Sequence, residues 1–157
     1  MPKPGRDPKR SITSWTTPEP GDVISYAYLW HHEAAKGQGE GLKDRPSVVV
    51  LAQQIVGDRT QLIVAPVTHS PPQSSDGAIE LPVSVKTKLG LDSDRSWIQT
   101  NEINIFVWPG PDVRIAKQSP ENSPLIGAIP EWLFLRLRDA IGATSRVGKL
   151  KSVKRSD

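Results

Sequence analysis

Two apolar runs separated by a short turn constrain the fold of this chain more than any other feature. Residues 47–54 read Ser-Val-Val-Val-Leu-Ala-Gln-Gln, and residues 61–68 read Gln-Leu-Ile-Val-Ala-Pro-Val-Thr. Short apolar runs rich in β-branched residues are typical of well-buried strands. The residues between them, 56–59, read Val-Gly-Asp-Arg and have the composition of a turn. The sequence therefore predicts a β-hairpin in which Gly57 and Asp58 are the two turn residues.

This turn sets the predicted register of the hairpin. Ser47 lies opposite Thr68 and Arg45 opposite Ser70, so that Arg45 and Thr68 become diagonal neighbours on one face, roughly 7–8 Å apart. A slip of one residue would place them on opposite faces, although both would stay at the same end of the hairpin. A permanent cation beside a hydroxyl at the rim of a sheet suits an anion such as a phosphate. The alternative is an exposed loop charge at Arg45 and an ordinary strand threonine at Thr68.

Other short runs of β-forming residues predict further strands at 22–29, 78–81, 96–100 and 103–108. Residues 83–91 are expected to form a connector, and residues 112–127 are expected to be mostly loop. The segment from Trp30 to Asp44 contains three glycines. A loop of this length inside a compact domain is either a functional lid or a tolerated surface insertion.

One helix is predicted at residues 130–141. Pro130 suits the first turn of a helix and Gly142 its end, and Leu133, Leu137 and Ile141 recur on one face. Several short strands followed by a single helix indicate a mainly β fold. We therefore expect a small, partly open β-barrel with a C-terminal helix packed on it.

The 157 residues are expected to form one domain, residues 20–143, between a flexible basic arm (1–19) and a loose basic tail (144–157). Basic ends on a mildly acidic body either attract a polyanion or are simply solvated. The chain has no cysteine, which excludes disulfides and thiolate chemistry and fits a reducing, cytoplasmic location. The sequence has no apolar run of membrane-spanning length and no signal-peptide pattern, so neither a membrane span nor a signal peptide is expected.

Several short motifs occur in a family-like order. They are Gly21-Asp22-Val23-Ile24, Arg45-Pro46, Val64-Ala-Pro-Val-Thr-His-Ser70, Leu81-Pro82, Gly90-Leu91, and Ser96 followed by Asn101-Glu102-Ile103. In order and spacing, over roughly residues 20–141, the chain resembles the MazF/PemK family of toxin endoribonucleases. The resemblance implies an SH3-like barrel, a homodimer and a cognate antitoxin partner. It also implies metal-independent cleavage of single-stranded RNA by 2′-hydroxyl attack, which leaves 2′,3′-cyclic phosphate and 5′-hydroxyl ends.

The resemblance also implies a site. Arg45 and Thr68 would hold the scissile phosphate. For proton transfer the sequence offers His32, Glu33, His69 and Glu102. Substrate contacts are expected from Lys43, Trp30, Ser70, Gln99 and Asn101. The pair His32-Glu33 is similar to a His-Glu pair found ahead of Arg-Pro in some members. The spacing between this pair and Arg45 is about seven residues longer here than in those members.

The chain departs from the family at two further positions. Gln99 and Asn101 stand where some members have an arginine and an aspartate, and neither of them titrates. Glu102 is adjacent but is expected on the other strand face. His69 titrates near neutrality and is either a substitute for the missing acid or a loop histidine without a role.

The histidines and the tryptophans of the chain allow two further interpretations, metal binding and base stacking. Neighbouring His31, His32 and Glu33 diverge, and with His69 they lack the spacing of a zinc site, so no metal and no other cofactor is predicted. Trp30, Trp97 and Trp108 either stack on RNA bases or belong to the core, and Trp132 is expected in the core. The alternative function is a non-catalytic barrel that binds nucleic acid or a protein partner.

Overall fold

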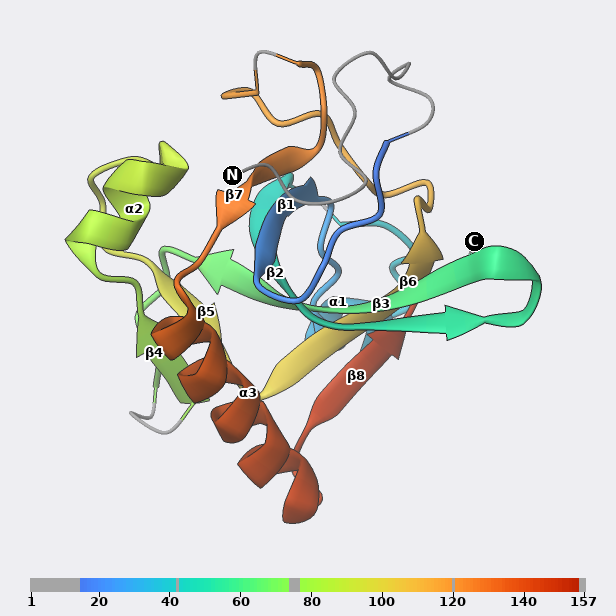
Figure 1. Cartoon of the computed structure of the whole chain (residues 1–157). Coiled ribbons are helices and arrows are strands. Elements are labelled where there is room, and N and C mark those ends of the chain that lie inside the picture. Colours follow the sequence, from blue (N-terminus) through green and yellow to red (C-terminus); the bar gives the residue numbers. More distant parts are fainter. Residues whose placement is uncertain (1–14, 42, 74–76, 120, 156–157) are drawn as a thin grey trace.

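The computed structural model describes residues 15–41, 43–73, 77–119 and 121–155. The strands are β1 (Asp22–Tyr26), β2 (Arg45–Ile55), β3 (Arg59–Thr68), β4 (Ala78–Glu80), β5 (Trp97–Gln99), β6 (Glu102–Trp108), β7 (Leu125–Ala128) and β8 (Lys151–Lys154). The helices are α1 (His31–Ala35), α2 (Val83–Leu89) and α3 (Glu131–Arg146). The fold is mainly β, and α3 packs on the sheet (Figure 1).

All eight strands belong to one sheet with the order β4-β5-β3-β2-β1-β7, from which β6 branches by pairing with β3 and β8 by pairing with β6. The pairings are antiparallel except for the parallel pair β6–β8. The end strands β4 and β7 are not paired with each other in the described part of the chain, so the barrel is open. The predicted class, a small, partly open β-barrel with a helix packed on it, is confirmed.

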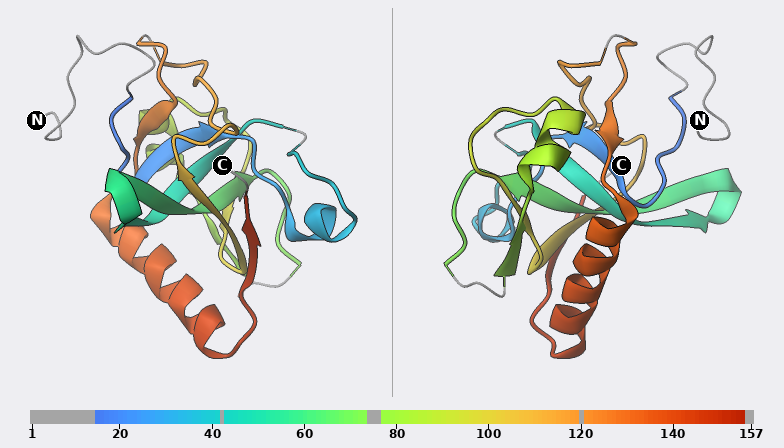
Figure 2. Two further views of the ribbon diagram at one scale, coloured as in Figure 1. Left: turned by 90° about the vertical axis from the view of Figure 1, so that its right-hand side faces the viewer. Right: turned by 60° about the vertical axis from the view of Figure 1, so that its left-hand side comes forward.

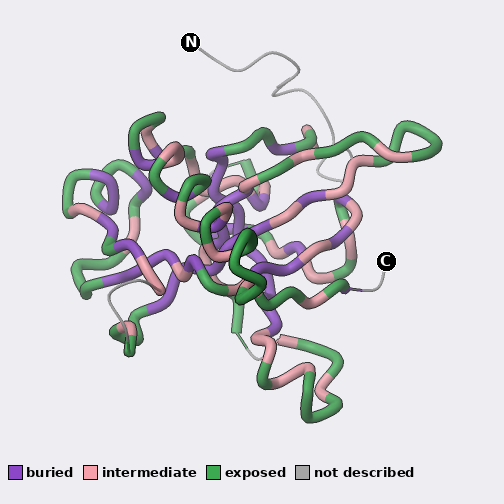
Figure 3. Tube along the Cα trace, turned by 90° about the horizontal axis from the view of Figure 1, so that it is seen from below, coloured by how far each residue is buried: buried purple, intermediate pink, exposed green. Residues whose placement is uncertain are grey.

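Strand β3 is the hub of this sheet. It pairs along its length with β2, through its first half with β6, and through its last two residues with β5. The tip of the β2–β3 hairpin extends away from the body of the molecule (Figure 2) and is exposed (Figure 3). The base of the hairpin therefore lies at the centre of the structure, where β3 exchanges one partner for another.

The predicted register of the hairpin was wrong by two residues, for two separate reasons. The turn is a three-residue 3-10 turn, Val56–Asp58, with positive φ at Gly57 and Asp58, so that Ile55 pairs with Arg59. A register shift between Val49 and Leu51 then moves the pairing by one more residue, and Ser47 lies opposite Pro66.

The two one-residue shifts together preserve the face that each side chain occupies. Continued to the ends of both strands, this register sets Arg45 level with Thr68, rather than diagonal to it. The hairpin therefore brings these two residues to the same place at its base, as expected, but by a different pairing.

Two apolar clusters fill the interior. Leu133, Leu137 and Ile141 of α3 pack against one face of the sheet, together with Val48 and Ala65. The second cluster combines aliphatic side chains with the aromatic side chains of Tyr26, Tyr28, Phe106 and Trp108. Trp97 is also buried.

Two expectations for the helix were wrong. Trp132 was expected in the core, but it is 50% exposed because it is one position out of phase with the buried stripe of α3. The helix also continues past Gly142 to Arg146. None of the helices in the described part of the chain has the length and apolarity needed to cross a membrane.

Three segments expected to be irregular are ordered elements. The connector at 83–91 contains α2, and the loop at 112–127 leads into β7. The described part of the tail, residues 144–155, is not loose, because α3 extends into it and β8 then pairs with β6. The barrel domain therefore reaches Arg155, beyond the predicted limit of 143. Most of the predicted arm, residues 1–14, lies outside the described residues, and Trp15 packs on Trp108 with ring centroids 6.4 Å apart.

Candidate functional site

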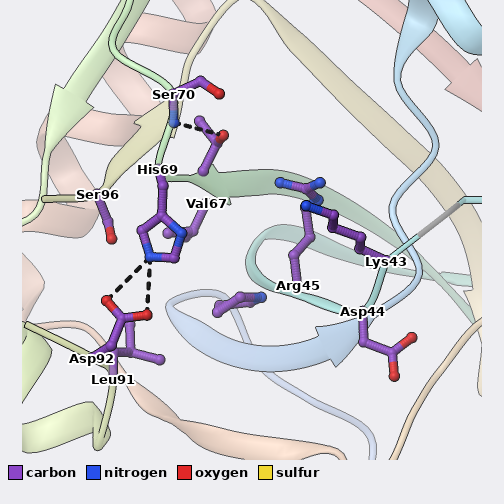
Figure 4. Close-up of a pocket in the computed structure, with 11 residues that line it drawn as sticks. Lys43, Asp44, Arg45, Val67, His69, Ser70, Leu91, Asp92 and Ser96 are labelled. Carbon is purple, nitrogen blue, oxygen red and sulfur yellow. Dashed lines mark hydrogen bonds and ion pairs between the residues drawn. The ribbon is translucent and has the colours of Figure 1, made fainter. Parts of the chain in front are cut away.

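Two adjoining cavities open at the base of the β2–β3 hairpin. The smaller one, the histidine cavity, has a volume of about 350 Å³ and is lined on one side by His69 and Asp92 (Figure 4). The larger one, the amide cavity, has a volume of about 680 Å³ and is lined by Gln73, Gln99 and Asn101, among others. Their shared lining residues are Arg45, Thr68 and Ser70.

The site residues predicted from the sequence all line one cavity or the other. The histidine cavity also contains Lys43, and the amide cavity also contains Trp30, His32 and Glu102. The predicted set is therefore brought together in space. Glu102 and Asn101 line the same cavity, contrary to the expected alternation of faces, because residues 100–101 form a bend between β5 and β6.

Arg45, the first residue of β2, carries a guanidinium whose donors have no hydrogen-bond partner among the described residues. Its Cζ lies 5.0 Å from the centre of the Trp30 ring, a cation–π contact that fixes its position. Its Nε is buried without a hydrogen bond, and the described residues offer the guanidinium no ion pair within 4 Å. Burial lowers the pKa of Arg45, and the charge of Glu33 opposes that shift. The group remains a cation, because guanidinium pKa values lie far above neutrality.

Thr68, the last residue of β3, is 6% exposed. Its Oγ1 accepts a hydrogen bond from the backbone N–H of Ser70 at 3.1 Å. With that acceptor position occupied, the hydroxyl keeps its own hydrogen for donation into the cavities. Arg45 and Thr68 thus present a charged and a neutral donor at the junction of the two cavities.

The segment that carries Trp30 is fixed from β6. The carboxylate Oε1 of Glu102 accepts from Tyr28 Oη at 3.1 Å and from the backbone N–H of His31 at 3.0 Å. Burial, followed by the charge of Glu102, raises the pKa of Tyr28, so this phenol stays protonated and donates. Glu33 closes the turn by accepting from the backbone N–H of Trp30 at 3.0 Å.

A second set of contacts ties the same segment to the C-terminal strand. Asn104 is fully buried, and its side chain accepts from Leu29 N at 3.0 Å and donates to Leu29 O at 2.8 Å. Arg155 donates through Nη1 to Asn104 Oδ1 at 3.2 Å and to Ala27 O at 2.9 Å. Its Nη2 forms an ion pair with Asp112 Oδ2 at 2.9 Å. The sequence reasoning missed this cluster, because nothing in the basic C-terminal residues signals a buried strand end.

The loop after α1 is docked rather than free where it passes β1. A Cβ placed on Gly41 would lie 2.6 Å from Ala27 O and too close to Tyr28 O as well. Only a residue without a side chain permits this approach. The loop therefore contacts the backbone just before Trp30. A lid that opens would have to break this contact, whereas a surface insertion would keep it.

His69 belongs to a charged cluster in the histidine cavity. Its Nε2 lies 3.1 Å and 3.0 Å from the two carboxylate oxygens of Asp92. Lys86 of α2 places Nζ 3.5 Å from Asp92 Oδ1, and the Lys86 side chain is only 6% exposed. Burial opposes ionisation of Asp92, but the hydrogen bond and charge of His69, with help from Asp94 N–H and Lys86, hold the pKa of this carboxyl below its usual range.

His69, Asp92 and Asp94 are also the described side chains that come nearest to a metal-binding group, since their ligand atoms all lie within 4.8 Å of one another. All three are exposed, and the ammonium of Lys86 competes for the Asp92 carboxylate. A fixed cation at this carboxylate disfavours a second one. We therefore assign no metal to these residues.

Asp92 and Lys86 were not predicted as site residues. The sequence did contain a signal for the helix that carries Lys86: Pro82 and Gly90 lie at its two ends, and Val85 and Leu89 lie on one face.

Comparison of the chain with models of protein families, with curated proteins and with solved structures finds no match to any of them.

Proposed function

We propose that this chain is an endoribonuclease that cleaves single-stranded RNA by attack of a 2′-hydroxyl on the adjacent phosphorus. The observation that carries the proposal is the guanidinium of Arg45, which is held against Trp30 beside Thr68 with its donors free for a ligand. A guanidinium offers a planar fork of donors that matches the oxygens of a phosphate. The motifs that resemble the MazF/PemK family support the same function.

In this reaction Arg45 and Thr68 stabilise the negative charge that develops on the phosphoryl oxygens. A base takes the proton of the 2′-hydroxyl, and an acid protonates the departing 5′-oxygen. The amide cavity offers His32, Glu33 and Glu102 for the first step. The products are a 2′,3′-cyclic phosphate and a 5′-hydroxyl end, and the mechanism requires no metal.

The two cavities suit the nucleotides on either side of the scissile phosphate. Trp30 offers an aromatic surface, and the amides of Gln99 and Asn101 can hydrogen-bond the edges of unpaired bases. Ser70 and the exposed Lys43 add a hydroxyl and a cation along the path of the backbone.

The proposal also covers the cellular location, the assembly and the protein partner that the resemblance to the MazF/PemK family implies. The chain would act in the cytoplasm as a homodimeric toxin, and a cognate antitoxin would restrain it by laying an acidic segment over Arg45 and Lys43. A short acidic protein encoded next to this one, and able to block cleavage at an equimolar ratio, is the expected partner.

The test is cleavage of a mixed RNA pool by the purified protein in EDTA, with mapping of new 5′-hydroxyl ends. We expect Arg45→Ala and Thr68→Ala to lower the rate by about 10²–10³ each. Arg138→Ala is the matched control, because Arg138 is an exposed arginine of α3 that lines neither cavity. Equal cleavage by Arg45→Ala and the wild type would reject the assignment.

A second candidate function is a non-catalytic barrel that binds RNA or a protein partner. It is favoured by one observation, the presence of non-titrating Gln99 and Asn101 in the cavity where proton transfer is required. RNA binding without any new ends, both in EDTA and in magnesium buffer, would establish it in place of the nuclease.

A further inference from the structure

Internal transfer at a phosphodiester ends with the departure of an alkoxide, which leaves slowly unless an acid protonates it. The histidine cavity contains a group arranged for that step. We propose that His69 is the acid for the departing 5′-oxygen, that Asp92 orients it, and that the buried Lys86 fixes Asp92. This inference rests on the proposed nuclease function and assigns one of its unassigned steps.

The position of His69 follows from the hairpin. His69 directly follows Thr68, and both residues line the histidine cavity together with Arg45. Figure 4 shows His69 and Arg45 reaching into this cavity from different sides. A phosphate bound by Arg45 and Thr68 at the junction would therefore direct one of its ester oxygens towards His69.

The partner of His69 determines which nitrogen can act. Nε2 faces both oxygens of Asp92, at 3.1 Å and 3.0 Å. In the imidazolium form the proton on Nε2 is donated to Asp92, which leaves the proton on Nδ1 for transfer. A carboxylate in this position fixes the orientation of the ring and stabilises its positive charge, as in other histidine–carboxylate pairs.

Lys86 distinguishes this cluster from an ordinary surface ion pair. An ammonium is costly to bury unless an opposite charge compensates it. Lys86 Nζ nevertheless has no hydrogen-bond partner among the described residues, and its nearest described anion is Asp92 Oδ1 at 3.5 Å. After the hydrogen bond and charge of His69 and the N–H of Asp94, the lysine adds to the lowering of the pKa of Asp92, and so helps to keep the transferable proton on the imidazole.

The proposed step balances as follows. The 2′-oxygen forms a bond to phosphorus as its proton passes to a base in the amide cavity. The bond from phosphorus to the 5′-oxygen breaks, and the departing oxygen keeps the electron pair and takes the proton from His69 Nδ1. The enzyme ends with a neutral imidazole and a protonated base, and exchange with solvent restores both.

The experiment compares two oligonucleotides that contain the cleavage sequence found with the RNA pool. One has the natural phosphodiester, and the other has sulfur in place of the bridging 5′-oxygen, which departs as a thiolate without needing an acid. His69→Ala is expected to slow cleavage of the natural substrate by about 10²–10³. Asp92→Asn and Lys86→Met are expected to slow it by about tenfold. All three are expected to cleave the sulfur substrate within about threefold of the wild type.

Two further variants make the comparison specific. Arg45→Ala is expected to cleave both substrates slowly, because the arginine stabilises the phosphoryl oxygens whichever group leaves. Asp94→Asn is expected to match the wild type on both, since Asp94 contacts Asp92 through its backbone N–H.

Equal slowing of both substrates by His69→Ala, or no slowing of either, would overturn the assignment of the acid while leaving the nuclease in place. A loss of activity in Asp94→Asn that added Mn²⁺ restores would overturn it in favour of a metal site. If the wild type cleaves nothing in the RNA pool, the proposed function fails first, and this inference falls with it.

Discussion

Three arginines of the described residues lie over aromatic rings, the exposed Arg95 and the less exposed Arg45 and Arg155. The difference between Arg45 and Arg155 separates a structural charge from an available one. Arg155 is 6% exposed, lies 5.6 Å from the Tyr26 ring centre, pairs with Asp112 and donates to Ala27 O. Arg45 lies 5.0 Å from the Trp30 ring centre, but its Nε is buried without a partner. The fold uses the donors of Arg155 for its own stability, whereas those of Arg45 remain available to a ligand.

The two environments have opposite energetic consequences. A buried cation that is fully paired and hydrogen-bonded becomes very costly to remove, since its partner is then left uncompensated. A half-buried cation without a partner costs stability while it is present. The lowered pKa of Arg45, caused first by burial, reflects that cost. The comparison therefore predicts that substitution of the two arginines changes stability in opposite directions.

The largest effect is expected from Arg155→Ala. The substitution leaves Asp112, whose side chain is 13% exposed, without its cation, and it frees the Ala27 carbonyl. Loss of one partner of a buried pair costs about 3–5 kcal/mol. The measurement is urea denaturation at neutral pH, with Arg138→Ala as the exposed control, for which a change within about 0.5 kcal/mol is expected. A loss as small as that of the control would show that the C-terminal strand is not held by this residue.

A smaller loss is expected from Gly41→Ala. The new Cβ would meet the backbone of Ala27 and Tyr28, and the strain would reach the Ala27 carbonyl that Arg155 binds. Overpacking of this kind costs about 1–3 kcal/mol. Gly39→Ala is the matched control, because nothing lies within 4 Å of a Cβ at Gly39. Denaturation of Gly41→Ala combined with Arg155→Ala tests the coupling: a combined loss smaller than the sum of the two is expected, and strict additivity would contradict it.

The fold could be predicted from the sequence where local pattern and tertiary structure agree. The hairpin strands and α3 have strong periodicity of their own. β8, by contrast, is a strand because of its tertiary contacts. Its sequence, Lys-Ser-Val-Lys, has no apolar run, and the strand is held by pairing with β6 and by the burial of Arg155. Sequence periodicity does not encode such a tertiary contact.

The site shows the same division. Arg45, Thr68 and the residues next to them line the cavities because they lie at the base of the hairpin, whose ends were foreseen even though its register was not. Gln99 and Glu102 reach the same place because β5 and β6 both pair with β3. Asp92 and Lys86 were not foreseen, because α2 was interpreted as a connector. Their role depends on a contact between α2 and the end of β3, which a turn or helix signal does not reveal on its own.

Arg45→Met is expected to change the free energy of unfolding less than Arg155→Ala does, and to raise it where Arg155→Ala lowers it. Methionine keeps an unbranched chain against Trp30 and removes the unpartnered Nε, so the free energy of unfolding should stay the same or rise by up to about 1 kcal/mol. RNA cleavage should fall by about 10²–10³ at the same time. Urea denaturation and the cleavage assay are run on one preparation. A loss of stability close to that of Arg155→Ala would mean that Arg45 is a structural charge after all.

The smallest effect concerns another buried cation, Lys86, through its partner Asp92. The folded-state pKa of Asp92 is lowered, so its contribution to stability is present above the unfolded value of about 3.9 and is lost as the pH falls through the folded value. Because the Asp92 and His69 side chains are more than half exposed, the contribution is a fraction of about 1 kcal/mol and is screened by salt. The measurement is the difference in unfolding free energy between the wild type and Asp92→Asn from about pH 5, above the lowered pKa of Asp92, to about pH 2. The difference should shrink towards zero on acidification. A constant difference would mean that the amide substitution acts through packing, and that Lys86 is buried without help from the carboxylate it faces.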